Sequence, residues 1–137
     1  MTANTWRIPL PPLCIFMPFY TIFNRTRQTW IATRVELAHT AHWRRVGLLK
    51  HDQLEIGQGL AIPGRSWIPF MAIHTIGMKF PIDVFFLDKN KRVVGLFTVP
   101  PNRMVCVLGA QCVLETAEGT ISTSSTRLGD EIILTIN

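Results

Sequence analysis

The chain lacks the short motifs that identify common enzyme classes from sequence. It has no Gly-rich phosphate-binding loop and no G-x-S-x-G nucleophile elbow. The serines of its Ser/Thr-rich stretch, residues 120–126, have no histidine near them in sequence, so nothing there indicates a hydrolytic triad. The sequence therefore offers no recognisable pair of nucleophile and base.

Cysteine is also scarce, with Cys14, Cys106 and Cys112 as the only three in 137 residues. An odd number without the spacing of a metal site argues against a disulfide framework. Cys106 and Cys112 lie in apolar runs, and we interpret both as small buried hydrophobic residues. These observations favour a reducing, cytoplasmic location. Export is the alternative, because the N-terminal stretch is apolar.

Charged residues make up only 17% of the chain, and their distribution is uneven. Residues 1–50 contain seven Lys and Arg side chains against Glu36 alone, whereas the remainder is close to neutral. A basic half indicates either a solvated surface or an anionic partner such as nucleic acid or a membrane surface. Because no nucleic-acid-binding motif accompanies it, nucleic acid is not the expected partner. An anion-binding surface would use Arg25, Arg27, Arg34, Arg44 and Arg45.

The N-terminal segment is apolar from Ile8 to Phe23 but contains four prolines. Proline breaks helices, and the run is shorter than the roughly 20 residues of a membrane-spanning helix. We therefore expect no transmembrane segment. Residues 1–20 are predicted to be a Pro-rich tail, either extended along the domain or translated from a misplaced start with Met17 as the true one. Residues 21–137 are predicted to form one domain.

Short apolar runs separated by turn signals predict a β protein. The turn Asp88–Lys91 lies between two such runs and predicts a hairpin. Thr40 has the character of an N-cap for a short helix over residues 41–49. The expected fold class is mainly β, a small single-domain barrel or sandwich with one short helix. The predicted strands cover residues 31–38, 60–62, 72–76, 82–87, 93–99, 104–108, 113–116 and 131–136.

The stretch Ile73–Asp88 places reactive polar side chains within an apolar sequence. Its central part, HTIGMKFPID from His74 to Asp83, resembles the signature of the domain of unknown function 192 family, a family of small prokaryotic proteins. The segments Arg45–Leu49, with its R-x-G-L pattern, and Val113–Glu115 also fit that family in order and spacing. The resemblance runs from about residue 21 to the C-terminus. It implies a compact, mostly β, barrel-like domain; since the family's activity is not established, it implies no catalytic residue or cofactor.

Asp83 is the most informative side chain of this stretch, because a carboxylate among aromatic residues is costly unless it is paired or hydrogen-bonded. It is either a ligand-contacting or general-base carboxylate, or a structural one bonded to backbone N–H groups after Pro81 or to Arg44 or Arg45. His74 is a candidate proton carrier. Metal-ligand spacing of the zinc type is absent, so we predict no metal ion and no cofactor. The predicted ligand-binding set is His74, Met78, Lys79, Asp83, Arg44 and Arg45.

Three functions are compatible with this sequence. The first is a non-enzymatic ligand-binding or accessory module whose partner is a small molecule or a protein. The second is a small enzyme that uses Asp83 or His74 as a general acid or base. The third is an anion-binding protein that acts through its basic N-terminal half.

Overall fold

The computed structural model describes residues 19–37, 53–65 and 67–136, which form nine β-strands and one short helix. Most of the strands are five to seven residues long, as the closely spaced turn signals of the sequence require. The elements are β1 (Tyr20–Asn24), β2 (Thr29–Leu37), β3 (Gln58–Pro63), β4 (Phe70–His74), β5 (Ile82–Leu87), β6 (Val93–Val99), β7 (Met104–Leu108), β8 (Cys112–Ala117), α2 (Thr120–Ser124) and β9 (Ile132–Ile136).

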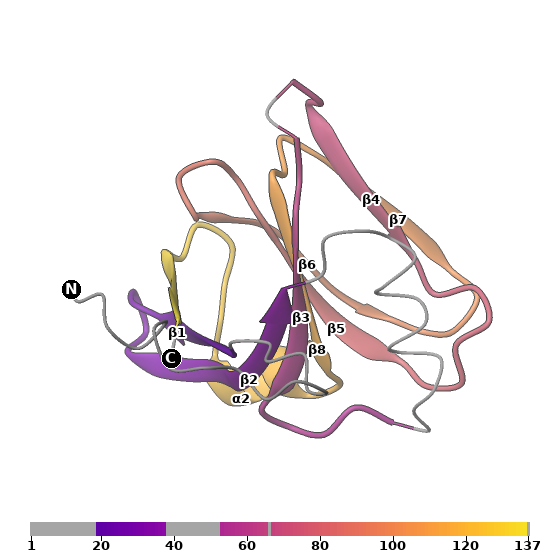
Figure 1. Cartoon of the computed structure of the whole chain (residues 1–137), viewed down its shortest axis with the longest axis horizontal. Helices are drawn as coiled ribbons and strands as arrows, with labels where there is room; N and C mark the ends of the chain where they lie inside the picture. The colour runs from indigo at the N-terminus through magenta and orange to yellow at the C-terminus, as the bar shows by residue number, and fades with distance from the viewer. Residues whose placement is uncertain (1–18, 38–52, 66, 137) are drawn as a thin grey trace, which may run out of the picture.

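Seven strands form one curled sheet in the order β6-β5-β8-β3-β2-β1-β9. Only the pair β2–β3 is parallel, and the other neighbours are antiparallel. The curl brings the beginning of β6 back to the segment before β9, where Arg92 and Glu131 form an isolated bridge. Val93 donates its N–H to the carbonyl oxygen of Asp130 at 2.9 Å. The sheet therefore forms a half-barrel (Figure 1). Backbone hydrogen bonds join the beginning of β6 to the segment before β9.

Strand β5 is buried along its whole length because both faces of the sheet are covered there. Phe85 and Leu87 point into the core enclosed by the curl, together with Val35 of β2 and Ile132 of β9. The alternate residues of β5 belong to a second core on the other face. This arrangement explains why β5, apart from Asp83, is an apolar run rather than an alternation of polar and apolar residues.

The second core is covered by a separate two-stranded sheet, the β4–β7 ribbon. Ile73 of β4 and the half-buried Val105 and Val107 of β7 pack onto it, against Phe86 of β5. The ribbon lies along the outer edge of the molecule, away from β1 and β9 (Figure 1). It therefore has one face on the core and one face directed outward.

The fold class expected from the sequence is confirmed: the protein is mainly β, a single domain with a curled half-barrel and one short described helix. The predicted Asp88–Lys91 hairpin is present, and the Asp88 carboxylate accepts the N–H groups of Asn90 and Arg92. Strand β1 and helix α2 were not predicted. The helix expected over residues 41–49 lies outside the described residues, as does the tail up to residue 18. No helix in the described parts of the chain is long and apolar enough to cross a membrane.

One burial prediction was wrong. Cys106 is exposed, whereas Cys112 is buried as expected. Cys106 lies on β7 opposite Ala72 of β4 and points to the outer face of the ribbon. Cys106 was expected to be buried because it lies in an apolar run, but only one face of β7 is covered.

Candidate functional site

Asp83, the central candidate, is buried and accepts three hydrogen bonds. Its side chain lies on the inner face of β5, and the residue is only 1% exposed. Oδ1 accepts the hydroxyl of Thr98 on β6 at 2.8 Å. Oδ2 accepts the backbone N–H groups of Gly119 at 3.1 Å and of Ile121 at 2.9 Å. Three of the roughly four acceptor positions of the carboxylate are thus taken by donors from within the fold.

These bonds connect β5 to the beginning of helix α2. Gly119 has a left-handed backbone, with φ at 98°, and no side chain of the cap itself accepts a hydrogen bond. The carboxylate of Asp83 satisfies the first N–H groups of the helix instead. Its negative charge also faces the positive end of the peptide dipoles. The structural interpretation of Asp83 as a carboxylate bound to backbone N–H groups therefore has direct support, although the donors are at residues 119 and 121 rather than after Pro81.

One buried polar atom near this contact has no partner. The hydroxyl of Thr120 is buried, and it has no hydrogen-bond partner in the part of the chain that the structure describes. The neighbouring hydroxyl of Ser124 donates to the carbonyl oxygen of Thr120 at 2.8 Å. Helix α2 is thus held from β5 at its first turn and by its own side chains at its end.

His74 lies at the end of β4, opposite Met104 of β7, on the outer face of the ribbon. Its Nδ1 accepts the backbone N–H of Ile76 at 3.3 Å. It is half-buried, unlike the exposed side chain of Met104. Of the predicted set, His74 lies on the outward-facing surface of the ribbon.

Met78 and Lys79 follow His74 in the signature but point to different environments. Met78 is buried in the second core with Phe80, as its apolar surroundings in the sequence indicated, whereas Lys79 is exposed. Asp83 lies on the face of β5 that points into the first core. The sheet therefore separates Met78 from Asp83. Arg44 and Arg45 lie outside the described residues, so the set of six stays a prediction.

Thr75, which was not among the residues selected from the sequence, fixes the loop of residues 75–81 between β4 and β5. Its buried hydroxyl donates to the carbonyl oxygen of Pro100 at 2.6 Å and accepts the N–H of Arg103 at 3.0 Å. Its backbone N–H also donates to the carbonyl oxygen of Arg103 at 2.8 Å. Asn102 adds a side-chain oxygen that accepts the N–H of Gly77 at 3.1 Å. The loop after β4 and the loop before β7 are therefore one hydrogen-bonded unit.

Two further buried carboxylates were not selected from the sequence. Glu115 lies in β8 between Leu60 of β3 and Val84 of β5, and it is 1% exposed. The signal that could have found it is the one that found Asp83, a carboxylate inside an apolar strand. Asp130 has no such signal, because it lies in the turn Leu128–Gly129–Asp130.

Asp130 is the centre of a polar network at the other end of the molecule. Its Oδ2 accepts hydrogen bonds from Asn24 Nδ2 at 3.0 Å, Arg27 Nε at 3.0 Å and the backbone N–H of Arg127 at 2.9 Å. Burial by itself would raise the pKa of Asp130, but these donors and the charge of Arg27 outweigh it and hold the pKa below its ordinary value. The network fixes the turn between β1 and β2 against the segment before β9.

Three of the five candidate arginines of the basic N-terminal half lie among the described residues. Arg25 pairs with Glu131 at 3.5 Å, and Arg27 pairs with Asp130 at 3.0 Å. The guanidinium of Arg34 lies 5.1 Å from the ring centre of Phe19. Each of these three side chains has a partner within the chain.

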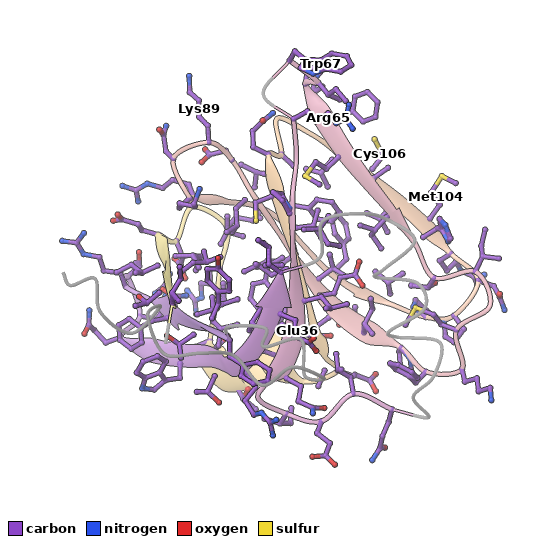
Figure 2. The ribbon with its side chains drawn as sticks, in the orientation of Figure 1. Glu36, Arg65, Trp67, Lys89, Met104 and Cys106 are labelled. Atoms are coloured by element: carbon purple, nitrogen blue, oxygen red, sulfur yellow. The ribbon has the colours of Figure 1, made fainter. Side chains whose placement is uncertain are left out.

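The outer face of the β4–β7 ribbon carries several exposed apolar side chains. Cross-strand pairs on this face are Phe70 with Leu108 and Ala72 with Cys106. Leu108 is 78% exposed, and Trp67, just before β4, is 74% exposed. Trp67, Cys106 and Met104 follow one another along this outer edge (Figure 2). Because folded domains rarely leave large apolar patches uncovered, this face is a candidate contact surface.

Comparison with known proteins places the chain in a family. The profile of DUF192, described as "Uncharacterized ACR", matches residues 22–134. The chain belongs to the DUF192 family. A UPF0127 protein from Thermococcus sibiricus is 31% identical over 112 residues, which cover 81% of this chain and 72% of that protein. The family resemblance carried by His74–Asp83 is thereby confirmed over nearly the whole of the predicted domain.

Two solved structures share the fold of this DUF192 chain. The first, a putative transcription regulator from Sinorhizobium meliloti, has a TM-score of 0.72 and 16% identity, and the match covers 90% of this chain and 97% of that one. The second, a protein of unknown function from Novosphingobium aromaticivorans, has a TM-score of 0.70 and 19% identity, and the match covers 91% of each chain. At such low identity, these similarities concern the fold alone.

Proposed function

We propose that this DUF192 protein is a non-enzymatic accessory module that binds a partner through the outer face of its β4–β7 ribbon. The observation that carries the proposal is the exposure of Phe70, Met104 and Leu108 on one side of a two-stranded sheet. Trp67, just before β4, is also exposed. Burial of such side chains against a partner removes apolar surface from water, which is the main driving force of association. His74, from the predicted ligand set, belongs to the same face.

The engagement of Asp83 supports a module rather than an enzyme. A general base must come within hydrogen-bond reach of the proton that it removes. Asp83 is 1% exposed, and its oxygens already hold Thr98, Gly119 and Ile121. Among the described residues, no group of three or more His, Cys, Asp or Glu side chains is arranged to hold a metal ion. The enzyme hypothesis stays a prediction that requires a substrate to reach this carboxylate.

The proposal is tested by photo-crosslinking in the host cell. A benzophenone amino acid replaces Cys106, at the centre of the face, in the full-length chain. The control carries it in place of Leu128, which is 65% exposed in the loop between α2 and β9. We expect a defined adduct from position 106 that disappears when Leu108→Ser is added, and no such adduct from position 128. Equal adducts from both positions, or none from position 106, would contradict the proposal.

A further inference from the structure

The charges around the ribbon have one sign. In the described residues between Pro63 and Ile82, and between Pro100 and Leu114, the charged side chains are Arg65, Lys79 and Arg103, with no Asp or Glu. All three are exposed. This distribution differs from the rest of the described surface, where carboxylates and cations are mixed.

The three cations lie at the two ends of the apolar face. Arg65 precedes β4 and lies close to Trp67 at one end of the ribbon (Figure 2). Arg103 precedes β7, and its backbone is bonded to Thr75, immediately after β4, at the other end. Lys79 belongs to the loop that follows Thr75. The face thus has an apolar centre and a positive group at each end.

We propose that the partner of this face is the surface of an anionic lipid bilayer. The inference rests on the proposed function, because it names what the outer face of the ribbon contacts. Tryptophan and arginine are suited to the boundary between headgroups and acyl chains, where one part of the side chain meets apolar surroundings and the other meets water or phosphate. Arg65 and Arg103 would contact lipid phosphates while Trp67, Phe70, Met104 and Leu108 enter the boundary region.

The geometry of the ribbon limits how deep the contact goes. Among the described strands, β4 and β7 each have one edge without a strand partner, and unpaired backbone groups are costly in the hydrocarbon core. Only the outward side chains would enter, to the depth of roughly 5–10 Å that is usual for interfacial binding. In the described part of the chain, the ribbon lies on the outside of the molecule (Figure 1).

An acidic protein would also complement this face, and the experiment separates the two occupants. The full-length chain is floated with vesicles of equal phosphatidylglycerol and phosphatidylcholine, and with vesicles of phosphatidylcholine alone. We expect binding to the anionic vesicles that falls steeply between low and high salt, and much weaker binding to the neutral ones. Absence of binding to the anionic vesicles at low salt would overturn the inference.

Matched variants assign the binding to the ribbon. Leu108→Ser and Trp67→Ser should each weaken vesicle affinity tenfold or more, whereas Leu128→Ser should not change it. Arg65→Gln and Arg103→Gln should each weaken it about fivefold at low salt, because a juxtamembrane cation contributes roughly that factor. Circular dichroism and unfolding curves establish that each variant is folded. Equal losses from Leu108→Ser and Leu128→Ser would overturn the assignment.

The two proposals fail in distinguishable ways. If position 106 crosslinks to a protein in the cell and the purified chain binds no vesicles, the lipid inference is wrong and the accessory function stands. If position 106 gives neither a protein nor a lipid adduct, both are wrong. A lipid adduct from position 106, together with vesicle binding that Leu108→Ser removes, supports both.

Discussion

The carboxylate of Asp83 on β5 accepts the backbone N–H of Ile121 at 2.9 Å, across 38 positions of sequence. This contact, with the parallel one from Gly119, explains how a five-residue helix persists in a segment without helical periodicity. An isolated helix of that length is unstable in water, because the conformational entropy lost in forming the first turn outweighs the free energy gained from its hydrogen bonds. Asp83, which the sequence presented as the strongest candidate for a functional carboxylate, therefore stabilises helix α2.

Replacement of Asp83 should therefore reduce stability in a graded way. In Asp83→Asn, the amide oxygen can still accept the N–H groups of Gly119 and Ile121, while its nitrogen donates to Thr98. We expect a loss of about 1 kcal/mol in the free energy of unfolding, since a charge-assisted bond becomes a neutral one. Asp83→Ala leaves buried donors without acceptors and should cost roughly 3 kcal/mol or more. Urea unfolding followed by fluorescence measures both.

The control for this pair is Glu118→Gln, which removes one negative charge from an exposed neighbouring position. Its effect should stay within about 0.5 kcal/mol, as is usual for surface substitutions. A loss of stability in Asp83→Ala no larger than that of Glu118→Gln would show that the hydrogen bonds to α2 are unimportant. The site at Asp83 would then again be a candidate for ligand binding.

The sequence predicted the strands well where turn signals bounded an apolar run. β5 and β6 were predicted with their observed bounds, because Asp88–Lys91 identifies the hairpin between them. β1 was missed because it continues a Pro-rich apolar run without alternation. Helix α2 was missed because it is stabilised by Asp83, a residue distant in sequence. Local patterns predict local structure, and they contain no information on a contact of this kind.

The candidate site was less predictable than the fold, for a related reason. Residues that are neighbours in an extended strand point to opposite faces. The signature His74–Asp83 turns between β4 and β5, so its polar side chains diverge. Cys106 was predicted to be buried, and its exposure follows from the position of the β4–β7 ribbon at the edge of the molecule. Tertiary arrangement, not composition, decides which face of an apolar strand meets water.

Thr75 provides a second test, of the unit formed by the loops before β7 and after β4. Thr75→Val removes a hydroxyl that bonds to Pro100 and Arg103 while it preserves the shape of the side chain. We expect a loss of about 2 kcal/mol, because the partly buried N–H of Arg103 and carbonyl oxygen of Pro100 lose this partner. Amide hydrogen exchange should accelerate at Arg103 and through β4 and β7.

Thr75→Ser is the matched control, because it keeps the hydroxyl and removes only a methyl group. It should lose about 1 kcal/mol and keep the protection of Arg103. If Thr75→Ser and Thr75→Val have the same exchange pattern, the hydroxyl does not hold the two loops together.

The network at Asp130 predicts how stability depends on pH. Its folded-state pKa lies below the ordinary value of 3.8. Above that value the carboxylate is charged in the folded and unfolded chains, and its contribution is complete. As pH falls below about 4, the unfolded chain binds a proton first, so this contribution is lost progressively as pH drops through the folded-state pKa. Asp130→Asn should be about 1–3 kcal/mol less stable than wild type at pH 6, and the two curves should converge at low pH.

The measurement for Asp130 is the free energy of unfolding at several pH values from 6 downward. Glu118→Gln again serves as the reference, because it changes the net charge equally without touching the network. Curves for wild type and Asp130→Asn that remain parallel down to low pH would mean that Asn24, Arg27 and Arg127 do not favour the charged form.

Gly59 and Gly95 each lie at a close approach that a side chain would disturb. A Cβ atom at Gly59 in β3 would lie 2.7 Å from the backbone oxygen of Glu115 in β8. A Cβ atom at Gly95 in β6 would lie 3.0 Å from a methyl group of Val107 on the ribbon. Because backbone yields less than side chains, Gly59→Ala should cost about 3 kcal/mol and Gly95→Ala about 1–2 kcal/mol. Thermal unfolding measures the stability of both variants. A larger loss in Gly95→Ala than in Gly59→Ala would contradict the close pairing of β3 with β8.

The two described cysteines should differ in reactivity, which tests the orientation of β7. Cys106 is exposed, whereas burial raises the pKa of the Cys112 thiol to about 11, with Lys91 lowering it in part. The thiolate is the reactive form, and at pH 7.5 it makes up fewer than about one in a thousand of the Cys112 side chains. In a Cys14→Ser background, a disulfide reagent should modify one thiol rapidly. Cys106→Ser should abolish this fast phase, and Cys112→Ser should leave it.

Unfolding in guanidinium supplies the control for this experiment, because both thiols should then react at similar rates. A fast phase that survives Cys106→Ser with undiminished amplitude would assign that phase to Cys112, and it would mean that Cys106 faces the core and the opposite face of β7 points outward. Since the pairs Phe70–Leu108 and His74–Met104 share the face of Cys106, they would be buried with it. The reactivity of one thiol therefore decides whether the apolar surface on which both proposals depend is exposed in solution.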